Sequence, residues 1–139
     1  MRQLTVELWA APIPILGRFA DHHWIVIVSD RGINRWEVWQ KQHVVDTSWG
    51  YLHRNLLPPK ANVGYGPSRH VRTWVDGDAR DIQHRVENSP TAYPWLNVYR
   101  FFPGPNSNTF VEWALGDVSR LTTRAPGAWY ARFAGRQIR

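Results

Sequence analysis

The alternation of apolar and polar residues predicts three strands in the first third of the chain. Residues 4–9 alternate with the period of a half-buried strand. Residues Trp24–Val28 form a continuous, mostly β-branched run, which is typical of a buried central strand. Residues Arg35–Gln40 alternate again and place Trp36 and Glu37 on opposite faces. Because a polar turn with a glycine separates the last two runs, they are predicted to form a β-hairpin.

Proline and glycine mark where further elements are expected to begin and end. Pro12 and Pro14 are expected to end the first strand, because proline has no N–H to donate to a neighbouring strand. Residues 46–69 contain several prolines and glycines and are expected to be mostly loop. Two more strands are predicted, over His70–Val75 and over Asn97–Phe102.

Two segments have the pattern of amphipathic helices. Over Asp78–Asn88 the apolar residues fall at helical spacing, and Asp78 is suited to cap the N-terminus. A second helix is predicted over Ser107–Leu115, because polar capping residues precede its apolar run. Residues 120–139 match no element clearly, and we expect a tail that docks through its aromatic side chains. The order of elements predicts an α+β fold, with a mainly antiparallel sheet packed against two or three helices.

The composition is that of one folded domain. The chain has 139 residues, which suits a single domain over residues 1–139, and 43% of them are hydrophobic. It contains no cysteine, which excludes disulfides, zinc–thiolate sites, iron–sulfur clusters and a cysteine nucleophile. No cofactor is expected.

The chain is basic, with a formal net charge of +6 that is carried almost entirely by arginine. Arginine binds phosphates and carboxylates through its planar fork. The arginines are scattered, and only residues 120–139 are locally dense, so the pattern disfavours specific nucleic-acid binding. The expected partner is a small-molecule, peptide or lipid ligand.

The beginning of the chain does not have the pattern of a signal peptide. Glu7, Pro12 and Pro14 interrupt any apolar core there. No run approaches the roughly 18 apolar residues of a membrane span. We therefore expect a soluble protein, cytoplasmic by default.

The segment Pro103–Phe110 is the candidate functional site, because Asn106, Ser107 and Asn108 all favour N-cap positions. The amides of a first helical turn lack partners and lie at the positive end of the helix dipole. A nucleophile at Ser107 would have amide groups, near Asn108 and Thr109, beside its developing oxyanion, and the same groups can bind an anionic ligand. The alternative is an ordinary helix cap with no further role.

A serine nucleophile needs a base, and the histidines are the candidates. His22 and His23 directly precede the buried strand, where a side chain can face a helix packed on the sheet. Neighbouring strand residues point to opposite faces, so the two do not readily share a metal, and no metal site is predicted. Glu37 is the candidate to orient the histidine, because a carboxylate among tryptophans needs a partner. The alternatives are a solvated loop edge for the histidines and a salt bridge to Arg35 for Glu37.

These residues resemble the signature of an uncharacterised bacterial family, domain of unknown function 3750. The similarity lies in the junction motif Pro103–Val111, in the tripeptide that begins at His22, and in the tripeptide that begins at Trp36. It runs over about residues 7–118. The tail departs from the family's usual ending, whose lysine has no counterpart here.

More distantly, the order of these residues is similar to that in circularly permuted papain-like proteins of the NlpC/P60 and lecithin-retinol-acyltransferase type. The resemblance implies a permuted papain-like fold with Ser107 at the cysteine position, His22 or His23 as base, and Glu37 on the next strand. It implies a hydrolase or acyltransferase that acts on an amide or ester. Serine in place of cysteine removes the thiolate. The alternative is therefore a non-catalytic module, on a degenerate papain-like scaffold, that binds an anionic ligand.

Overall fold

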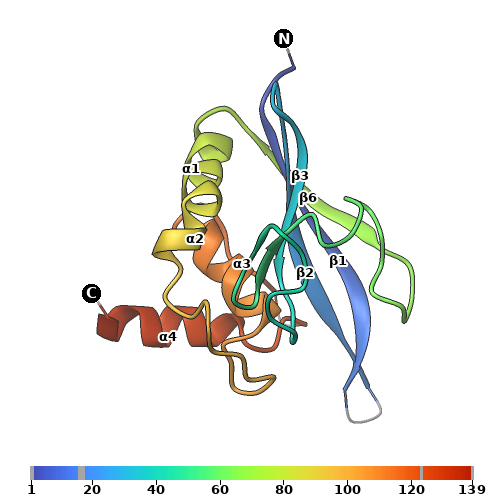
Figure 1. The fold of residues 1–139 in the computed structure, drawn as a ribbon, viewed down its shortest axis with the longest axis vertical. Helices are drawn as coiled ribbons and strands as arrows, with labels where there is room; N and C mark the ends of the chain where they lie inside the picture. Colours follow the sequence, from blue (N-terminus) through green and yellow to red (C-terminus); the bar gives the residue numbers. More distant parts are fainter. Residues whose placement is uncertain (1, 16–17, 123, 139) are drawn as a thin grey trace.

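In the computed structural model, six antiparallel strands form one sheet in the order β4-β5-β3-β2-β1-β6 (Figure 1). The structure describes residues 2–15, 18–122 and 124–138. The strands are β1 Thr5–Ile15, β2 Arg18–Ser29, β3 Gly32–Val38, β4 Ser48–Trp49, β5 Leu52–Arg54 and β6 Arg69–Val75. The helices are α1 Asp76–Glu87, α2 Ser89–Ala92, α3 Ser107–Leu115 and α4 Ala128–Ile138. The predicted α+β class is confirmed, although the described residues form four helices and not two or three.

The first strand continues through both of its prolines, so the prediction that they end it is wrong. Pro12 pairs with Asp21 of β2, and the Asp21 N–H points away from β1 to the Arg124 carbonyl. Pro12 and Pro14 therefore occupy pairs that exchange no backbone hydrogen bonds, where a missing N–H is tolerated. On its other side, β1 pairs with β6 only over residues 5–10, so no neighbour requires these two N–H groups.

The predicted hairpin is confirmed, because β2 and β3 are adjacent and pair Ile25 with Trp36. The strand predicted over Asn97–Phe102 is absent, and this segment runs as turns and bends. Its apolar residues have other environments: Tyr99 packs on the core, whereas Phe102 is 78% exposed. The alternating pattern there does not mark one buried face.

The helices differ from prediction mainly at their ends. Helix α1 begins two residues early, with Val75 as its N-cap and no side-chain cap bond, so Asp78 is not the cap. Helix α3 has the predicted bounds and begins after Asn106. The tail forms α4, and its Tyr130 packs edge-to-face on Trp95 with ring centroids 5.3 Å apart.

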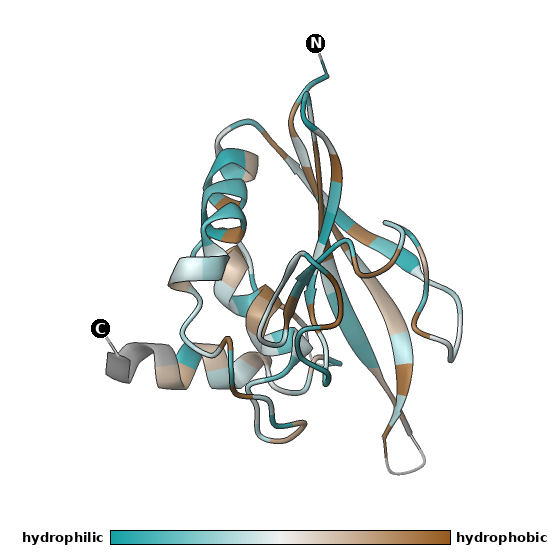
Figure 2. Ribbon diagram, viewed as in Figure 1, coloured by the Kyte–Doolittle hydropathy of each residue, from teal (hydrophilic) through white to brown (hydrophobic). Residues whose placement is uncertain are grey.

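The two faces of the sheet carry two separate apolar clusters. Helices α1 and α3 cover one face, where Ile25 and Trp36 are buried. Figure 2 shows apolar bands on these helices where they meet the sheet. The opposite face buries Trp24 and Val26, and the Trp24 indole donates to the Pro59 carbonyl of the loop after β5. Side chains that alternate along β2 therefore enter different environments, which separates the two adjacent histidines.

Candidate functional site

The first half of β2 has an open edge, because β3 pairs only with residues 25–29. The N-terminus of α3 and the chain that follows α3 occupy this edge. The Asp21 N–H donates to the Arg124 carbonyl (2.9 Å), and the His23 N–H donates to Oδ1 of Asn108 (3.2 Å). Nδ2 of Asn108 donates back to the Asp21 carbonyl (2.8 Å). One side-chain amide thus takes the hydrogen-bonding place of a neighbouring strand.

The N-terminus of α3 is closed by a reciprocal cap. Oδ1 of Asn106 accepts the N–H groups of Asn108 (3.0 Å) and Thr109 (3.2 Å), and Oγ1 of Thr109 accepts the Asn106 N–H (2.9 Å). Gly127, at φ 94°, lies so close that an added Cβ would be 2.2 Å from the Asn106 amide. The Asn108 and Thr109 amides, which we expected to face an oxyanion or ligand, are therefore both bonded to Asn106. The Ser107 N–H is the amide of this turn for which the described residues offer no acceptor.

His23 faces α3 and is held by Asn108. Its Nδ1 lies 2.9 Å from Oδ1 of Asn108, and that oxygen already accepts the His23 backbone N–H. This network assigns the ring proton to Nδ1, because the amide oxygen can only accept. Burial lowers the pKa of His23 from 6.5 to about 4, although the hydrogen bond to Asn108 and the charge of Asp21 oppose the shift. His23 is therefore neutral near pH 7.

His22 faces the other way and is held by Glu37. Its Nε2 lies 2.9 Å from Oε1 of Glu37, which is fully buried. Burial alone would raise the pKa of Glu37, but the hydrogen bonds and charges of His22 and Arg35 outweigh it and lower the pKa to about 2. Glu37 is therefore an anion. The sequence leaves open whether Glu37 orients a histidine or pairs with Arg35, and in the structure it contacts both.

Arg35 fixes this carboxylate from behind. Its Nε and Nη2 both donate to Glu37, Nη2 at 2.9 Å, and its side chain is fully buried. The guanidinium carbon lies 3.9 Å from the ring centroid of Trp24. Nη1 donates to the carbonyls of Pro58 (2.9 Å) and Ala61 (2.7 Å). The loop after β5 is thereby fastened over the face that carries His22.

A cavity of about 1170 Å³ connects the two groups of polar residues. His22, Ser107 and Arg124 line it, together with Asn106 and Asn108, whereas His23 does not. Its remaining wall is largely apolar, and no Asp or Glu from the described residues lines it. Ser107 is 6% exposed. Within residues 2–15, 18–122 and 124–138, no hydrogen bond joins Ser107 to either histidine.

A second serine–histidine pair lies elsewhere and was missed in the sequence. Oγ of Ser48 is 2.6 Å from Nδ1 of His53, and Nε2 of His53 is 2.9 Å from the Lys41 carbonyl. Burial lowers the pKa of His53, which favours the neutral ring. Because the Lys41 carbonyl can only accept, Nε2 donates to it, and Nδ1 accepts a hydrogen bond from the Ser48 hydroxyl. The two residues face each other across β4 and β5, very short strands within a segment expected to be loop. No sequence pattern marks this pair, and it does not line the cavity.

Two further properties of the described residues bear on function. They contain no group of three histidine, aspartate or glutamate side chains that could hold a metal ion. None of the helices they form is long and apolar enough to cross a membrane.

These features define an α+β protein in which a capped helix N-terminus and a carboxylate-held histidine share one cavity. A family model described as "Protein of unknown function (DUF3750)" matches residues 3–129, which is most of the chain. The chain belongs to this family, and the resemblance found in the sequence is confirmed at that level. No curated protein and no solved structure matches the chain.

Proposed function

We propose that the protein is a hydrolase or acyltransferase that acts on an amide or ester, with Ser107 as nucleophile and His22 as base. One observation carries the proposal: His22 and Ser107 line the same cavity, and the buried Glu37 anion holds Nε2 of His22 at 2.9 Å. A base needs the neutral form of the ring, and in that form Nε2 carries the proton, because Glu37 can only accept. Nδ1 is then the nitrogen that can take the proton of the Ser107 hydroxyl.

The reaction consists of the acylation of Ser107 and its deacylation. Oγ of Ser107 attacks the carbonyl carbon of the substrate while its proton passes to Nδ1 of His22. The leaving amine or alcohol then departs with that proton, and an acyl-serine remains. Water releases the acid in a hydrolase, whereas a second alcohol or amine accepts the acyl group in an acyltransferase. Glu37 stays ionised throughout and stabilises the imidazolium.

The oxyanion would be bound by fewer helix amides than the sequence suggested. The Asn108 and Thr109 amides bond to Asn106, so the Ser107 N–H is the donor that the first turn offers. Each such donor is worth about 10²–10³ in rate in enzymes of this kind. The Arg124 guanidinium also lines the cavity, and although its Nε lies 3.6 Å from Oδ2 of Asp21, it is the second group that could meet a negative oxygen.

His23 is the less suitable base, although its free Nε2 has the right protonation state. It does not line the cavity, and its Asn108 bonds support the open edge of β2. Ser107 and His22 form no direct hydrogen bond, so the proposal requires the substrate or one water to bridge them. Catalytic contacts are often long before substrate binds. The distant similarity to permuted papain-like proteins supports the same assignment of Ser107, His22 and Glu37.

A fluorophosphonate serine probe tests the proposal, with the labelled residue identified by mass spectrometry. Ser107→Ala should lose the label, and His22→Ala should slow labelling by about 10²-fold or more, which is the usual contribution of a general base. Ser48→Ala is the matched control, because, among the described residues, Ser48 bonds directly to a histidine, which Ser107 does not, and Ser48 lies outside the cavity. Equal labelling of the wild type and Ser107→Ala would sink the proposal.

A binding module for an anionic ligand is the second candidate. Arg124 favours it, because no carboxylate among the described residues lines the cavity, and Ser107 lines the same cavity. Thermal shift with inorganic phosphate and with acetate separates the two functions. Stabilisation that survives Ser107→Ala and disappears in Arg124→Gln supports the binding module, and no stabilisation by either anion contradicts it.

A further inference from the structure

The exposed aromatic side chains of the described residues gather in two places. Four of them line the cavity: Phe19 (58% exposed), Tyr65 (59%), Phe101 (41%) and Phe102 (78%). The other two, Trp129 and Phe133, stack on α4 with ring centroids 5.0 Å apart and are 58% and 53% exposed. The exposed aliphatic side chains of Ile33, Val71 and Val75, by contrast, lie on β3 and β6. Large exposed apolar groups in one region are uncommon on a soluble protein and mark an interaction site.

These two places belong to one end of the molecule. Nη2 of Arg100, next to Phe101, donates to the hydroxyl of Tyr130, next to Trp129 (3.1 Å). In Figure 1 the lower part of the β1–β2 hairpin, the loop before α3 and helix α4 all lie in the half of the molecule away from the N-terminus. We call this region, with its six exposed aromatic side chains, the aromatic end.

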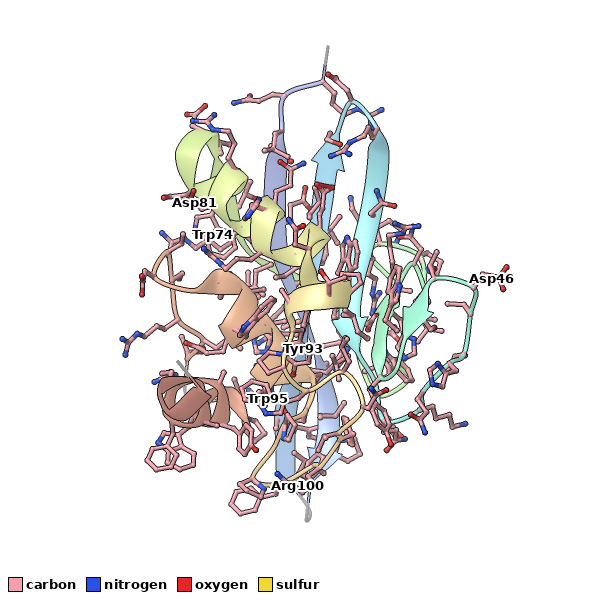
Figure 3. The ribbon with its side chains drawn as sticks, turned by 60° about the vertical axis from the view of Figure 1, so that its left-hand side comes forward. Asp46, Trp74, Asp81, Tyr93, Trp95 and Arg100 are labelled. Carbon is pink, nitrogen blue, oxygen red and sulfur yellow. The ribbon has the colours of Figure 1, made fainter. Side chains whose placement is uncertain are left out.

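The charge of the aromatic end is positive. Residues 88–111, which supply its loop, contain no aspartate or glutamate but do contain Arg100. Of the other basic residues nearby, Arg124 pairs with Asp21 (3.6 Å) and Arg132 pairs with Glu112 (3.1 Å). Arg100 forms no ion pair with a carboxylate of the described residues. The acidic residues of α1 lie at the opposite end, as Figure 3 shows for Asp81 and Arg100. Arg100 therefore gives the aromatic end a positive charge that no carboxylate of the described residues pairs with.

We propose that the aromatic end docks on an anionic lipid bilayer, with the mouth of the cavity against the membrane. Aromatic side chains prefer the level of the lipid headgroups, and basic side chains near the surface are attracted to anionic lipids. Phe19, Phe102 and Trp129 come from three separate segments, so they can enter the interface as individual anchors. The positive charge selects an anionic surface over a zwitterionic one. This inference stands on exposure and charge, and it holds whether or not Ser107 is a nucleophile.

Vesicle co-sedimentation tests the docking. The purified protein should bind vesicles of equal parts phosphatidylglycerol and phosphatidylcholine, and should bind phosphatidylcholine vesicles at least about tenfold more weakly, because each basic residue near the surface adds about one kcal/mol. Phe102→Ser and Trp129→Ser should each weaken binding about tenfold through the lost apolar burial. Ile33→Ser is the matched control, since Ile33 is 47% exposed and pairs with Val28, far along β2 from Phe19.

The outcomes separate docking from catalysis and from self-association. Binding that falls with added salt and with Phe102→Ser, but not with Ser107→Ala or Ile33→Ser, supports the proposal. Absence of binding to anionic vesicles overturns it, as does equal binding by the wild type and both aromatic variants. A dimer in light scattering that Phe102→Ser dissociates, without vesicle binding, also overturns it and assigns the surface to a second copy of the chain.

Discussion

The side chain of Asn108 should be one of the largest single contributors to the stability of this fold outside the apolar core. It completes the open edge of β2 through the His23 N–H and the Asp21 carbonyl, and it also bonds to the His23 ring. The fourth partner of Asn108 is the Pro126 carbonyl. This carbonyl also accepts a hydrogen bond from Nδ2 of Asn106, so it keeps a partner when Asn108 is replaced. Asn108→Ala therefore leaves three buried polar groups without a partner.

The magnitude follows from these three groups. A buried donor or acceptor left unsatisfied costs about 1–3 kcal/mol, so Asn108→Ala should lower the free energy of unfolding by at least about 3 kcal/mol. The better helix propensity of alanine returns only about 0.5 kcal/mol. Asn108→Asp keeps an acceptor for the His23 N–H but removes both amide donors, so it should not restore the wild-type stability.

Urea unfolding followed by far-UV circular dichroism measures this loss. Asn62→Ala is the control, because Asn62 accepts one backbone N–H on an exposed loop and such changes stay within about 0.5 kcal/mol. A loss below about 1 kcal/mol for Asn108→Ala, at an unchanged slope with urea, would refute the reasoning. It would mean that water or a shifted backbone satisfies the edge as well as the amide does.

Two further predictions concern the buried ionisable groups. The pKa of His23 is about 4 in the folded protein and 6.5 when unfolded, so the unfolded chain binds more protons between these values. Stability should therefore fall by about 3 kcal/mol as the pH drops from 6.5 to 4, and an unchanged urea midpoint between pH 7 and pH 5 would contradict this. Glu37→Gln leaves the buried Arg35 charge unpaired and should cost about 3–5 kcal/mol, whereas Arg35→Met combined with Glu37→Leu should be less destabilising in thermal denaturation. If Glu37→Gln were as stable as the wild type, the Arg35 charge would not depend on Glu37, and the prediction would be wrong.

The sequence predicts the elements best where a segment has one buried face and clear ends. Helix α3 has the predicted bounds, because Asn106 and the apolar run leave one way to start it. The β2–β3 hairpin follows from its turn and from the alternation in β3. The end of β1 is predicted wrongly at Pro12, because a proline ends a strand only where a neighbouring strand needs its N–H. Whether a neighbour does so depends on the sheet and not on the local sequence. The loop containing Phe102 misleads because exposed aromatic residues imitate the pattern of a strand.

The candidate site is predictable as a set of residues but not as a set of contacts. His22 and Glu37 come together because adjacent strands bring their side chains to one face, which strand alternation indicates. The sequence does not show that Asn108 bonds to His23, since the two are 85 residues apart. It also does not show that Asn106 occupies the helix amides, because a cap and an anion compete for the same groups.

The closing of the β2 edge by Asn108 has a consequence for how the chain behaves among its own copies. An open strand edge is a template on which a second chain can add a strand. Here Asn108 and the Arg124 carbonyl occupy the Asp21 and His23 N–H groups and the Asp21 carbonyl without forming a strand of their own, so they leave no new edge beyond them. The same few atoms that hold the helix beside the histidines therefore also protect the centre of the sheet from intermolecular pairing.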